Sequence, residues 1–297
     1  MKTRFFSFIT MAVAAMMLVS CSEDPPVVEI FFEADESDPY TINFTTQSEN
    51  ASSFAWEFGD GGTGEGAEVS HTYAASGDYS VTVTAKGDGG EATSTKEVSI
   101  AASMAEMISG GASANGKTWV LSRTATPGLD GAGSFDASFP ADMMPGTDNV
   151  LDILGLGVEY DNEFTFYHDG SYEVNNVDGT NLAGWLYAGM NIPQEDWVIM
   201  TDVGIFSVKS PTPQGATWSL TEDTDLTMDG VNEDPVDGSV TEKTATFEAA
   251  DYITFTNGGF AVLQDLNTIV IVRAVDSERL TLAIFMHSVQ SAADKPS

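Results

Sequence analysis

An aromatic alternation that runs into a glycine turn constrains the N-terminal third of this chain more than any other feature. Residues 54–58 read FAWEF, so one face of an extended segment is aromatic and the other carries Ala and Glu. Residues 59–62 (GDGG) then combine glycines, which permit positive φ, with the Asp60 carboxylate, which accepts hydrogen bonds from turn N–H groups. The pattern predicts a core strand with Trp56 pointing inward, ended by a tight turn.

A second alternation follows in residues 79–85 (YSVTVTA), where aromatic and aliphatic residues share one face. It predicts a second half-buried strand. The succession WEFGDG, HTY (residues 71–73) and GDYSVTVTA closely resembles the PKD domain, a small Ig-like β-sandwich common in extracellular and surface proteins. The resemblance implies that residues 27–101 form this sandwich and that it serves as a spacer rather than as a catalyst.

The charge of the chain limits its partners. There are 11 Lys and Arg residues against 45 Asp and Glu residues, which gives a formal net charge of -34. Such a charge repels nucleic acids, anionic membrane surfaces and polyanionic ligands. We therefore expect no nucleic-acid partner and favour a neutral or cationic ligand. The second interpretation is that the acidity serves only solubility.

The N-terminus carries the one cysteine of the chain, Cys21, so an internal disulfide and a cysteine-rich metal site are excluded. Lys2 and Arg4 precede an apolar stretch, residues 5–19, that is too short to span a bilayer comfortably. The sequence LVSC at residues 18–21 resembles a bacterial lipobox. This resemblance implies that residues 1–20 are a signal peptide and that Cys21 is acylated after cleavage. The alternative is an ordinary signal peptide with an incidental cysteine.

The residues after the cysteine point to the final location. Residues 22–24 (SED) are similar to the acidic export signal of Bacteroidota surface lipoproteins. That resemblance implies a lipid-anchored protein on the extracellular face of the outer membrane. We interpret residues 21–26 as a tether that leads into the first domain.

The remainder of the chain is dominated by strand patterns. We expect a linker at residues 102–116, with at most one helical turn at 104–108, and a larger domain at 117–290 before a tail at 291–297. Asp169 and Gly170, flanked by FTFYH and SYEVNNV, are a strong hairpin signal. The fold class is therefore all-β: a PKD sandwich followed by a larger antiparallel sandwich or barrel of the jelly-roll or carbohydrate-binding-module type.

The arrangement of lipobox, acidic export signal, PKD domain, KTWVL and YDNEFTFYHDGSYEV is similar to lipoproteins of Bacteroidota polysaccharide-utilisation systems. The resemblance implies a surface glycan-binding lipoprotein with three partners: a polysaccharide, a SusC/SusD-type importer and surface glycoside hydrolases. We expect capture of a neutral polysaccharide, such as the β-glucan laminarin, because the acidic chain repels anionic polymers such as sulfated or uronic-acid polysaccharides. A purely structural or adhesive surface protein is an alternative.

Sugar recognition needs flat hydrophobic faces for pyranose rings and polar groups for hydroxyls. Aromatic residues outside regular strand alternation are the available candidates, each weighed against a place in the core. The predicted glycan-binding residues are Trp185, Tyr187, Trp197, Trp218, Tyr160, Phe135 and Phe139. Trp185, Tyr187 and Trp197 lie in segments that we interpret as loops.

An enzymatic alternative rests on Glu159, Asp161 and Glu163, which have the E-x-D-x-E form seen in retaining β-glucanases. In a strand this spacing puts all three carboxylates on one face, as a nucleophile and acid pair requires. A solvated strand face is the competing interpretation.

We expect no cofactor. An acidic run is nevertheless an alternative Ca2+ site with oxygen ligands, although a solvated loop accounts for it more simply. Its candidate metal ligands are Asp225, Asp229 and Asp234.

Overall fold

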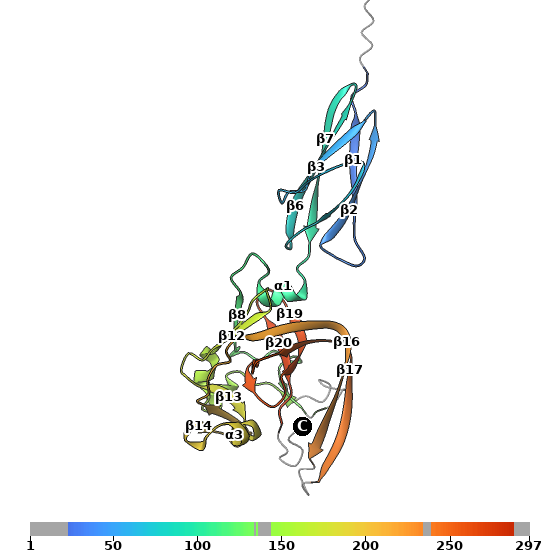
Figure 1. Ribbon diagram of the computed structural model, residues 1–297. Helices are drawn as coiled ribbons and strands as arrows, with labels where there is room; N and C mark the ends of the chain where they lie inside the picture. Colours follow the sequence, from blue (N-terminus) through green and yellow to red (C-terminus); the bar gives the residue numbers. More distant parts are fainter. Residues whose placement is uncertain (1–22, 134, 136–143, 234–238, 288–297) are drawn as a thin grey trace, which may run out of the picture. The chain divides into compact units, whose positions relative to one another are not determined.

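The computed structural model describes residues 23–133, 135, 144–233 and 239–287. The chain divides into two compact units, one that ends at Ala101 and one that begins at Ala102 (Figure 1). Strands dominate both units, which confirms the all-β class.

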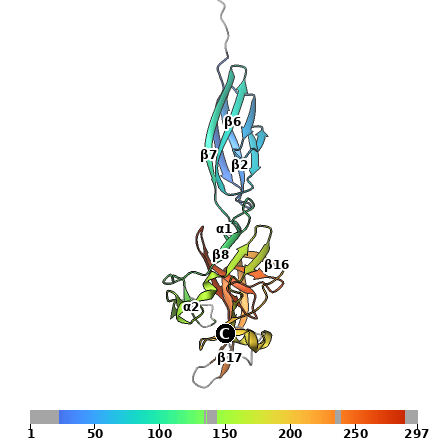
Figure 2. The ribbon, with the colours of Figure 1, turned by 90° about the vertical axis from the view of Figure 1, so that its left-hand side faces the viewer.

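The first unit consists of two facing antiparallel sheets, whose strands Figure 2 shows. One sheet has the order β1-β2-β5 and the other has the order β4-β3-β6-β7. The strands are β1 (Val27–Ala34), β2 (Thr41–Glu49), β3 (Ser53–Glu57), β4 (Thr63–Glu65), β5 (Glu68–Thr72), β6 (Gly77–Gly87) and β7 (Gly90–Ile100).

Trp56 occupies the centre of the core between these sheets, as the alternation in β3 predicts. Its side chain is 1% exposed, and its indole N–H donates a hydrogen bond to the Gly66 carbonyl at 2.9 Å. The chain then turns sharply at Gly59, where φ is +88° and a Cβ would lie 2.9 Å from the backbone N and O of Ser80. This close approach of two backbones requires glycine.

The glycine turn is fastened to β5 by Asp60 and His71. The Asp60 carboxylate lies 2.7 Å from His71 Nε2, and the His71 ring stacks on Phe58 with 4.1 Å between centroids. Burial opposes ionisation of Asp60, but the hydrogen bonds from His71 and from the Gly62 N–H outweigh it and lower the pKa of this carboxyl. The motif residues of this unit therefore hold the fold together.

The second unit is built on a seven-stranded sheet within the described residues, with the order β20-β19-β17-β16-β12-β11-β8. All neighbouring strands are antiparallel, and the sheet is nearly barrel-like. The free edges are β8 and β20. The strands are β8 (Lys117–Val120), β11 (Glu163–Phe166), β12 (Ser171–Asn175), β16 (Ala216–Glu233), β17 (Val240–Phe255), β19 (Ile269–Val275) and β20 (Leu280–Ile284).

The hairpin signal at Asp169 and Gly170 is confirmed. Strands β11 and β12 pair with Phe164 opposite Val174, and the turn between them has Gly170 at φ +84°. The side chain of Asp169 accepts a hydrogen bond from the Ser171 N–H at 2.9 Å. This is an Asx turn, in which the Asp side chain accepts a hydrogen bond from a backbone N–H two residues later, as the Asp-Gly dipeptide predicts.

A second, four-stranded sheet among the described residues has the order β14-β15-β13-β18. Its strands are β13 (Asn181–Gly184), β14 (Trp197–Met200), β15 (Ile205–Val208) and β18 (Leu263–Gln264), and β13 pairs with β18 in parallel. Short helices accompany this sheet and the barrel: η1 (Gly157–Asp161), α3 (Trp185–Asn191) and η2 (Gln194–Asp196).

The segment 102–116, expected to be a linker, instead contributes to the second unit. It contains helix α1 (Met104–Ser109), which Ser103 caps at the N-terminus and Gly110 ends in the left-handed conformation. Ile108 is fully buried in the core of the large sheet, and its carbonyl accepts the indole N–H of Trp119 at 2.8 Å. Apolar residues on one face of a short helix explain why this segment packs instead of remaining extended.

Candidate ligand-binding pocket

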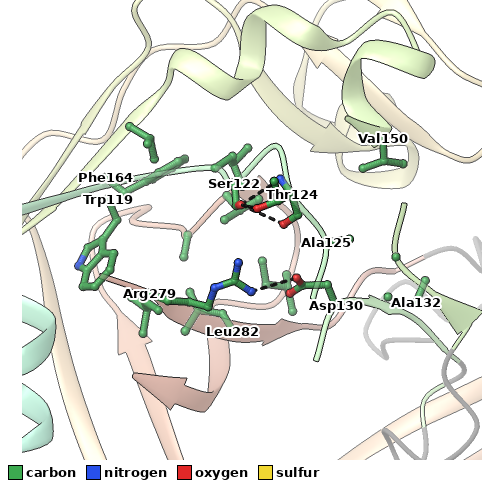
Figure 3. Close-up of a pocket in the computed structure, with 18 of the residues that line it drawn as sticks. Trp119, Ser122, Thr124, Ala125, Asp130, Ala132, Val150, Phe164, Arg279 and Leu282 are labelled. Atoms are coloured by element: carbon green, nitrogen blue, oxygen red, sulfur yellow. Dashed lines mark hydrogen bonds and ion pairs between the residues drawn. The ribbon is translucent and has the colours of Figure 1, made fainter. Parts of the chain in front are cut away.

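A cavity of about 650 Å³ opens in the second unit between the two free edges of the large sheet. Residues of β8 line one side, residues of β20 line another, and residues within 121–132 and 144–150 add to the lining (Figure 3). These two stretches include the short strands β9 (Gly131–Ala132) and β10 (Met144–Pro145), and the second leads into helix α2 (Val150–Ile153). The volume is within the usual range for small-molecule sites.

The walls of the pocket are mainly apolar. In β20 the residues alternate, so that Leu280, Leu282 and Ile284 line the cavity while Thr281 and Ala283 are buried on the opposite face. A half-buried tryptophan, Trp119 of β8, completes the apolar lining from the other edge. A period-two strand at the edge of a curved sheet thus provides one face for the pocket and one for the core.

The Trp119 ring is held from two sides. Its indole N–H is committed to the Ile108 carbonyl, and the Lys117 ammonium lies 4.0 Å from its ring centroid. Burial lowers the pKa of Lys117, although the charge of Asp276 opposes this shift. Because its only polar atom is already bonded, Trp119 offers a ligand an apolar surface alone.

Polar groups are concentrated at one end of the pocket, where Figure 3 shows Arg279 beside Asp130. Arg279 Nη1 lies 3.3 Å from Asp130 Oδ2 and donates a second hydrogen bond to the Thr126 hydroxyl. Ser122 and Thr124, whose hydroxyls lie 3.0 Å apart, add two neutral polar groups. The pocket therefore combines a long apolar wall with one ion pair and hydroxyls.

The predicted aromatic residues do not form one site. Trp218 is 7% exposed in the core of the large sheet, where its indole N–H donates to the Tyr167 carbonyl at 2.9 Å. Tyr160 is 4% exposed and accepts a hydrogen bond from the Leu151 N–H. Phe135 is 3% exposed and belongs to a third cluster, against Phe247 and Phe285. These three side chains are core residues. Phe139 lies outside the described residues.

Trp185, Tyr187 and Trp197 do lie in one region, around α3 and β14. The first two belong to a helix rather than the expected loop, and Trp197 begins a strand. The Trp197 indole N–H donates to the Ile192 carbonyl. The Trp197 ring packs against Phe206, with 5.3 Å between the ring centroids. All three are half-buried, so each offers at most part of its ring to solvent.

Trp185 covers the turn between β14 and β15. A Cβ at Gly204 would lie 3.0 Å from its indole ring, so glycine allows this close packing. Tyr187 packs against the buried cluster of Ala183, Ala188 and Val208. Burial, and then the negative charge of Asp265, raises the pKa of its hydroxyl. Trp185 is therefore the better placed of these residues for contact with a ligand.

The three acids of the E-x-D-x-E motif do not share a strand face. Glu159 and Asp161 lie in the 3-10 helix η1, and β11 begins only at Glu163. The Glu159 side chain is fully buried, whereas Asp161 is exposed and Glu163 is half-buried. The helical turn breaks the period of two, so the predicted arrangement of nucleophile and acid is not formed.

Glu159 has a structural environment instead. Its carboxylate accepts hydrogen bonds from Asn162 Nδ2 at 2.6 Å, from the Thr180 hydroxyl at 2.7 Å and from the Ser207 hydroxyl. These donors connect η1 to β15 and to the residue before β13. A buried carboxylate with three donors thus ties η1, which leads into β11, to the four-stranded sheet.

Two of the candidate Ca2+ ligands, Asp225 and Asp229, lie on β16, where they accept hydrogen bonds from protein groups. Asp225 accepts a hydrogen bond from the Ala249 N–H at 3.0 Å, and Asp229 accepts one from the Thr244 hydroxyl at 2.6 Å. Asp234 and Cys21 lie outside the described residues. Within the part of the chain that the structure describes, no cluster of three or more His, Cys, Asp or Glu side chains has the geometry of a metal site.

The pocket residues escaped prediction because their sequence signals are those of a core. Trp119 and Leu121 alternate with Thr118 and Val120, and Leu280, Leu282 and Ile284 alternate with Thr281 and Ala283 in LTLAI. Both patterns indicate one buried face but not whether that face meets other side chains or a cavity. These faces line a cavity because β8 and β20 lie at the two edges of the sheet, and the local sequence does not reveal that position.

The fold and the pocket define a two-unit all-β protein with an internal cavity in its second unit. The family model of the PKD domain matches residues 23–102. This part of the chain is therefore a PKD domain, as its motifs predicted. No curated protein matches the chain. In the described residues, no helix is long and apolar enough to cross a membrane.

Similar solved structures are PKD domains. The PKD1 domain of Vibrio anguillarum Epp is 25% identical, with coverage of 27% of this chain and 98% of that chain and a TM-score of 0.25. The PKD1 domain of the Vibrio cholerae metalloprotease PrtV is 26% identical, with coverage of 26% and 98% and a TM-score of 0.24. The PKD domain of the human VPS10 domain-containing receptor SorCS2 is 17% identical, with coverage of 34% and 97% and a TM-score of 0.24.

Proposed function

We propose that this chain is a surface-displayed binding protein whose second unit holds a ligand with a substantial apolar part. The observation that carries the proposal is the cavity of about 650 Å³ between β8 and β20, with its continuous wall of aliphatic side chains and Trp119. An apolar group that moves from water onto this wall gains about 25 cal/mol for each Å² of surface that it buries. A ligand with a large apolar surface is thus the class that this pocket binds best.

Binding is favoured over catalysis by the state of the polar groups. In the pocket, Asp130 is engaged by Arg279 and by the Thr126 N–H at 2.5 Å. The acids of the motif, by contrast, are divided between a buried network (Glu159), an exposed helical turn (Asp161) and the half-buried start of β11 (Glu163). A general acid or nucleophile needs to reach the reacting atom, and Glu159 is enclosed by its own donors.

The rest of the chain supports display at a surface. The sequence LVSC is the basis for proposing acylation of Cys21 and attachment to the outer face of the outer membrane. The PKD domain then acts as a spacer between the anchor and the binding unit. A SusC/SusD-type importer and surface hydrolases remain proposed partners, on the resemblance of the whole arrangement.

The test uses the mature chain from residue 21 and an uncharged fluorescent probe, N-phenyl-1-naphthylamine. We expect saturable binding with enhanced fluorescence and a stoichiometry of one. Leu282→Trp and Ile284→Trp, which fill the cavity, should each abolish it. Val198→Trp, on an exposed position of β14, is the matched control and should bind like the unmodified chain. Absent binding, or equal binding by the filled and control variants, would overturn the proposal.

A second candidate function is capture of a neutral polysaccharide such as laminarin at the surface of α3. The observation in its favour is Trp185, a half-buried indole that covers the β14–β15 turn and leaves part of its ring accessible. Sugars bind to such faces through their C–H side. The acidic charge of the chain supports a neutral rather than an anionic polymer.

Affinity electrophoresis against neutral and acidic polysaccharides tests this second candidate. Trp185→Ala should weaken binding by about 1 to 3 kcal/mol if the ring is a stacking platform. Leu282→Trp should leave glycan binding unchanged, because it fills a different site. Reducing ends that accumulate in the wild type would instead support the hydrolase alternative.

A further inference from the structure

Among the described residues that line the pocket, Arg279 is the one cation. Contacts within the protein hold its backbone in place without a ligand. It immediately precedes β20, and its backbone N–H donates to the Asp276 carboxylate at 2.8 Å. Its side chain is 32% exposed, so the guanidinium lies at the boundary between the cavity and solvent. The backbone hydrogen bond and the neighbouring strand β20 fix the position of the Arg279 backbone.

The guanidinium has unused donors. Both of its side-chain contacts, with Asp130 and with the Thr126 hydroxyl, are made by Nη1. Arginine carries five N–H donors, and in the described residues Nε and Nη2 of Arg279 have no protein partner. Figure 3 shows the guanidinium inside the pocket, with one terminal nitrogen directed to Asp130 and another turned away from it.

We propose that Arg279 binds an uncharged oxygen acceptor on the ligand, such as an ester carbonyl, an amide carbonyl or a hydroxyl. The apolar body of the ligand then lies along Trp119 and Leu282. This inference rests on the proposed function, because it assigns the polar end of a ligand held in the same pocket. It gives the ligand class as a neutral amphiphile, for example an acyl ester.

Local charge selects a neutral acceptor over a carboxylate. Asp130 already compensates the positive charge of Arg279 at 3.3 Å, and Glu278 also lines the pocket. A carboxylate ligand would place a further negative charge beside these two acids, in a chain of net charge -34. A carbonyl or hydroxyl accepts the same N–H bonds without this repulsion. The Ser122 and Thr124 hydroxyls can form further hydrogen bonds with the ligand.

The experiment displaces bound N-phenyl-1-naphthylamine from the mature chain at neutral pH. Three ligands of equal chain length are compared: glycerol monolaurate, laurate and dodecyltrimethylammonium. We expect the neutral ester to displace the probe at a concentration about tenfold lower than laurate does, because laurate brings a further negative charge beside Asp130 and Glu278. It should also act at a lower concentration than the ammonium, which cannot accept a hydrogen bond.

Arg279→Met removes the donors while it retains an unbranched side chain, so it should raise the concentration of ester needed to displace the probe about tenfold, the factor expected for one charge-assisted hydrogen bond. Arg123→Met is the matched control, because Arg123 pairs with Asp152 at 2.6 Å and does not line the pocket. This control should leave the displacing concentration of the ester unchanged.

The outcomes distinguish failure of the proposed function from failure of the arginine assignment. If the probe does not bind, both the proposed function and this inference are overturned. Probe binding combined with laurate or the ammonium as the stronger competitor overturns the inference alone. The inference is likewise overturned if Arg279→Met leaves the displacing concentration of the ester unchanged.

Discussion

The buried carboxylate of Glu159 gives the sharpest test of how the second unit is held together. We consider Glu159→Gln, which keeps the shape of the side chain and replaces one oxygen by NH2. The remaining oxygen can still accept the Thr180 and Ser207 hydroxyls. The new amide, however, faces Asn162 Nδ2, which now donates to Glu159 at 2.6 Å. Two donors then meet in a site without exposure to solvent.

The magnitude follows from that replacement. A hydrogen bond to a charged group is worth about 1.5–3 kcal/mol, and an orphaned buried donor costs about 1–3 kcal/mol. The second cost is reduced, because Asn162 Nδ2 also donates to the Thr180 carbonyl at 3.0 Å. We expect a loss of roughly 2–4 kcal/mol in the free energy of unfolding. For a domain of this size each kcal/mol corresponds to about 2–4 °C in Tm.

Differential scanning calorimetry of the whole chain is the appropriate assay, since it can separate the transitions of the two units. The matched control is Glu163→Gln, the same substitution at a half-buried residue with one hydrogen bond from Asn175 at 2.8 Å. That variant should stay within about 0.5 kcal/mol of the wild type. Equal effects of the two substitutions would refute the structural role assigned to Glu159.

Three further predictions concern residues whose surroundings differ. Trp218→Ala should cost about 3–5 kcal/mol by emptying the core, whereas Trp185→Ala should cost clearly less; denaturant unfolding compares the two, and equal losses would contradict the burial difference. Gly59→Ala should destabilise only the PKD domain, by about 1–3 kcal/mol, because of its positive φ and the nearby backbone; a shift in the calorimetric transition of the second unit would argue otherwise. Asp60→Asn should destabilise the PKD domain at neutral pH, and the difference in thermal unfolding should vanish as the pH falls below 3.8, because a lowered pKa stabilises only the ionised form. A difference that stays constant with pH would show that the charge of Asp60 does not matter.

The PKD domain could be predicted from the sequence in some detail because its signals are local. The alternation around Trp56 and the glycine turn are each encoded within a few adjacent residues. Both features also follow from residue type, because aromatic alternation favours an extended backbone and a turn with positive φ favours glycine. The strands β19 and β20 were predictable for the same reason, since the apolar residues of IVIVRAV and LTLAI and the turn between them are short-range features.

The pocket was not predictable, because it depends on which strands end at the sheet edges. Trp119 and Trp218 both lie in segments with strand alternation, yet Trp119 lines a cavity and Trp218 fills the core. The helix at Trp185 was missed as well, since a short helix with Gly189 in it has little intrinsic helical preference. Packing of Leu186 and Ala188 in the interior stabilises it instead.

The order of the strands has a consequence for when the pocket can exist. Strand β8 is the first strand of the large sheet in the chain and β20 is the last, yet residues of both line the same cavity. Contacts between such distant segments form slowly and late in folding. An emerging or partly folded chain therefore has no binding site. A ligand that contacts both β8 and β20 links the first strand of the large sheet to the last. Such a ligand can therefore bind only when both strands have taken their places in the sheet.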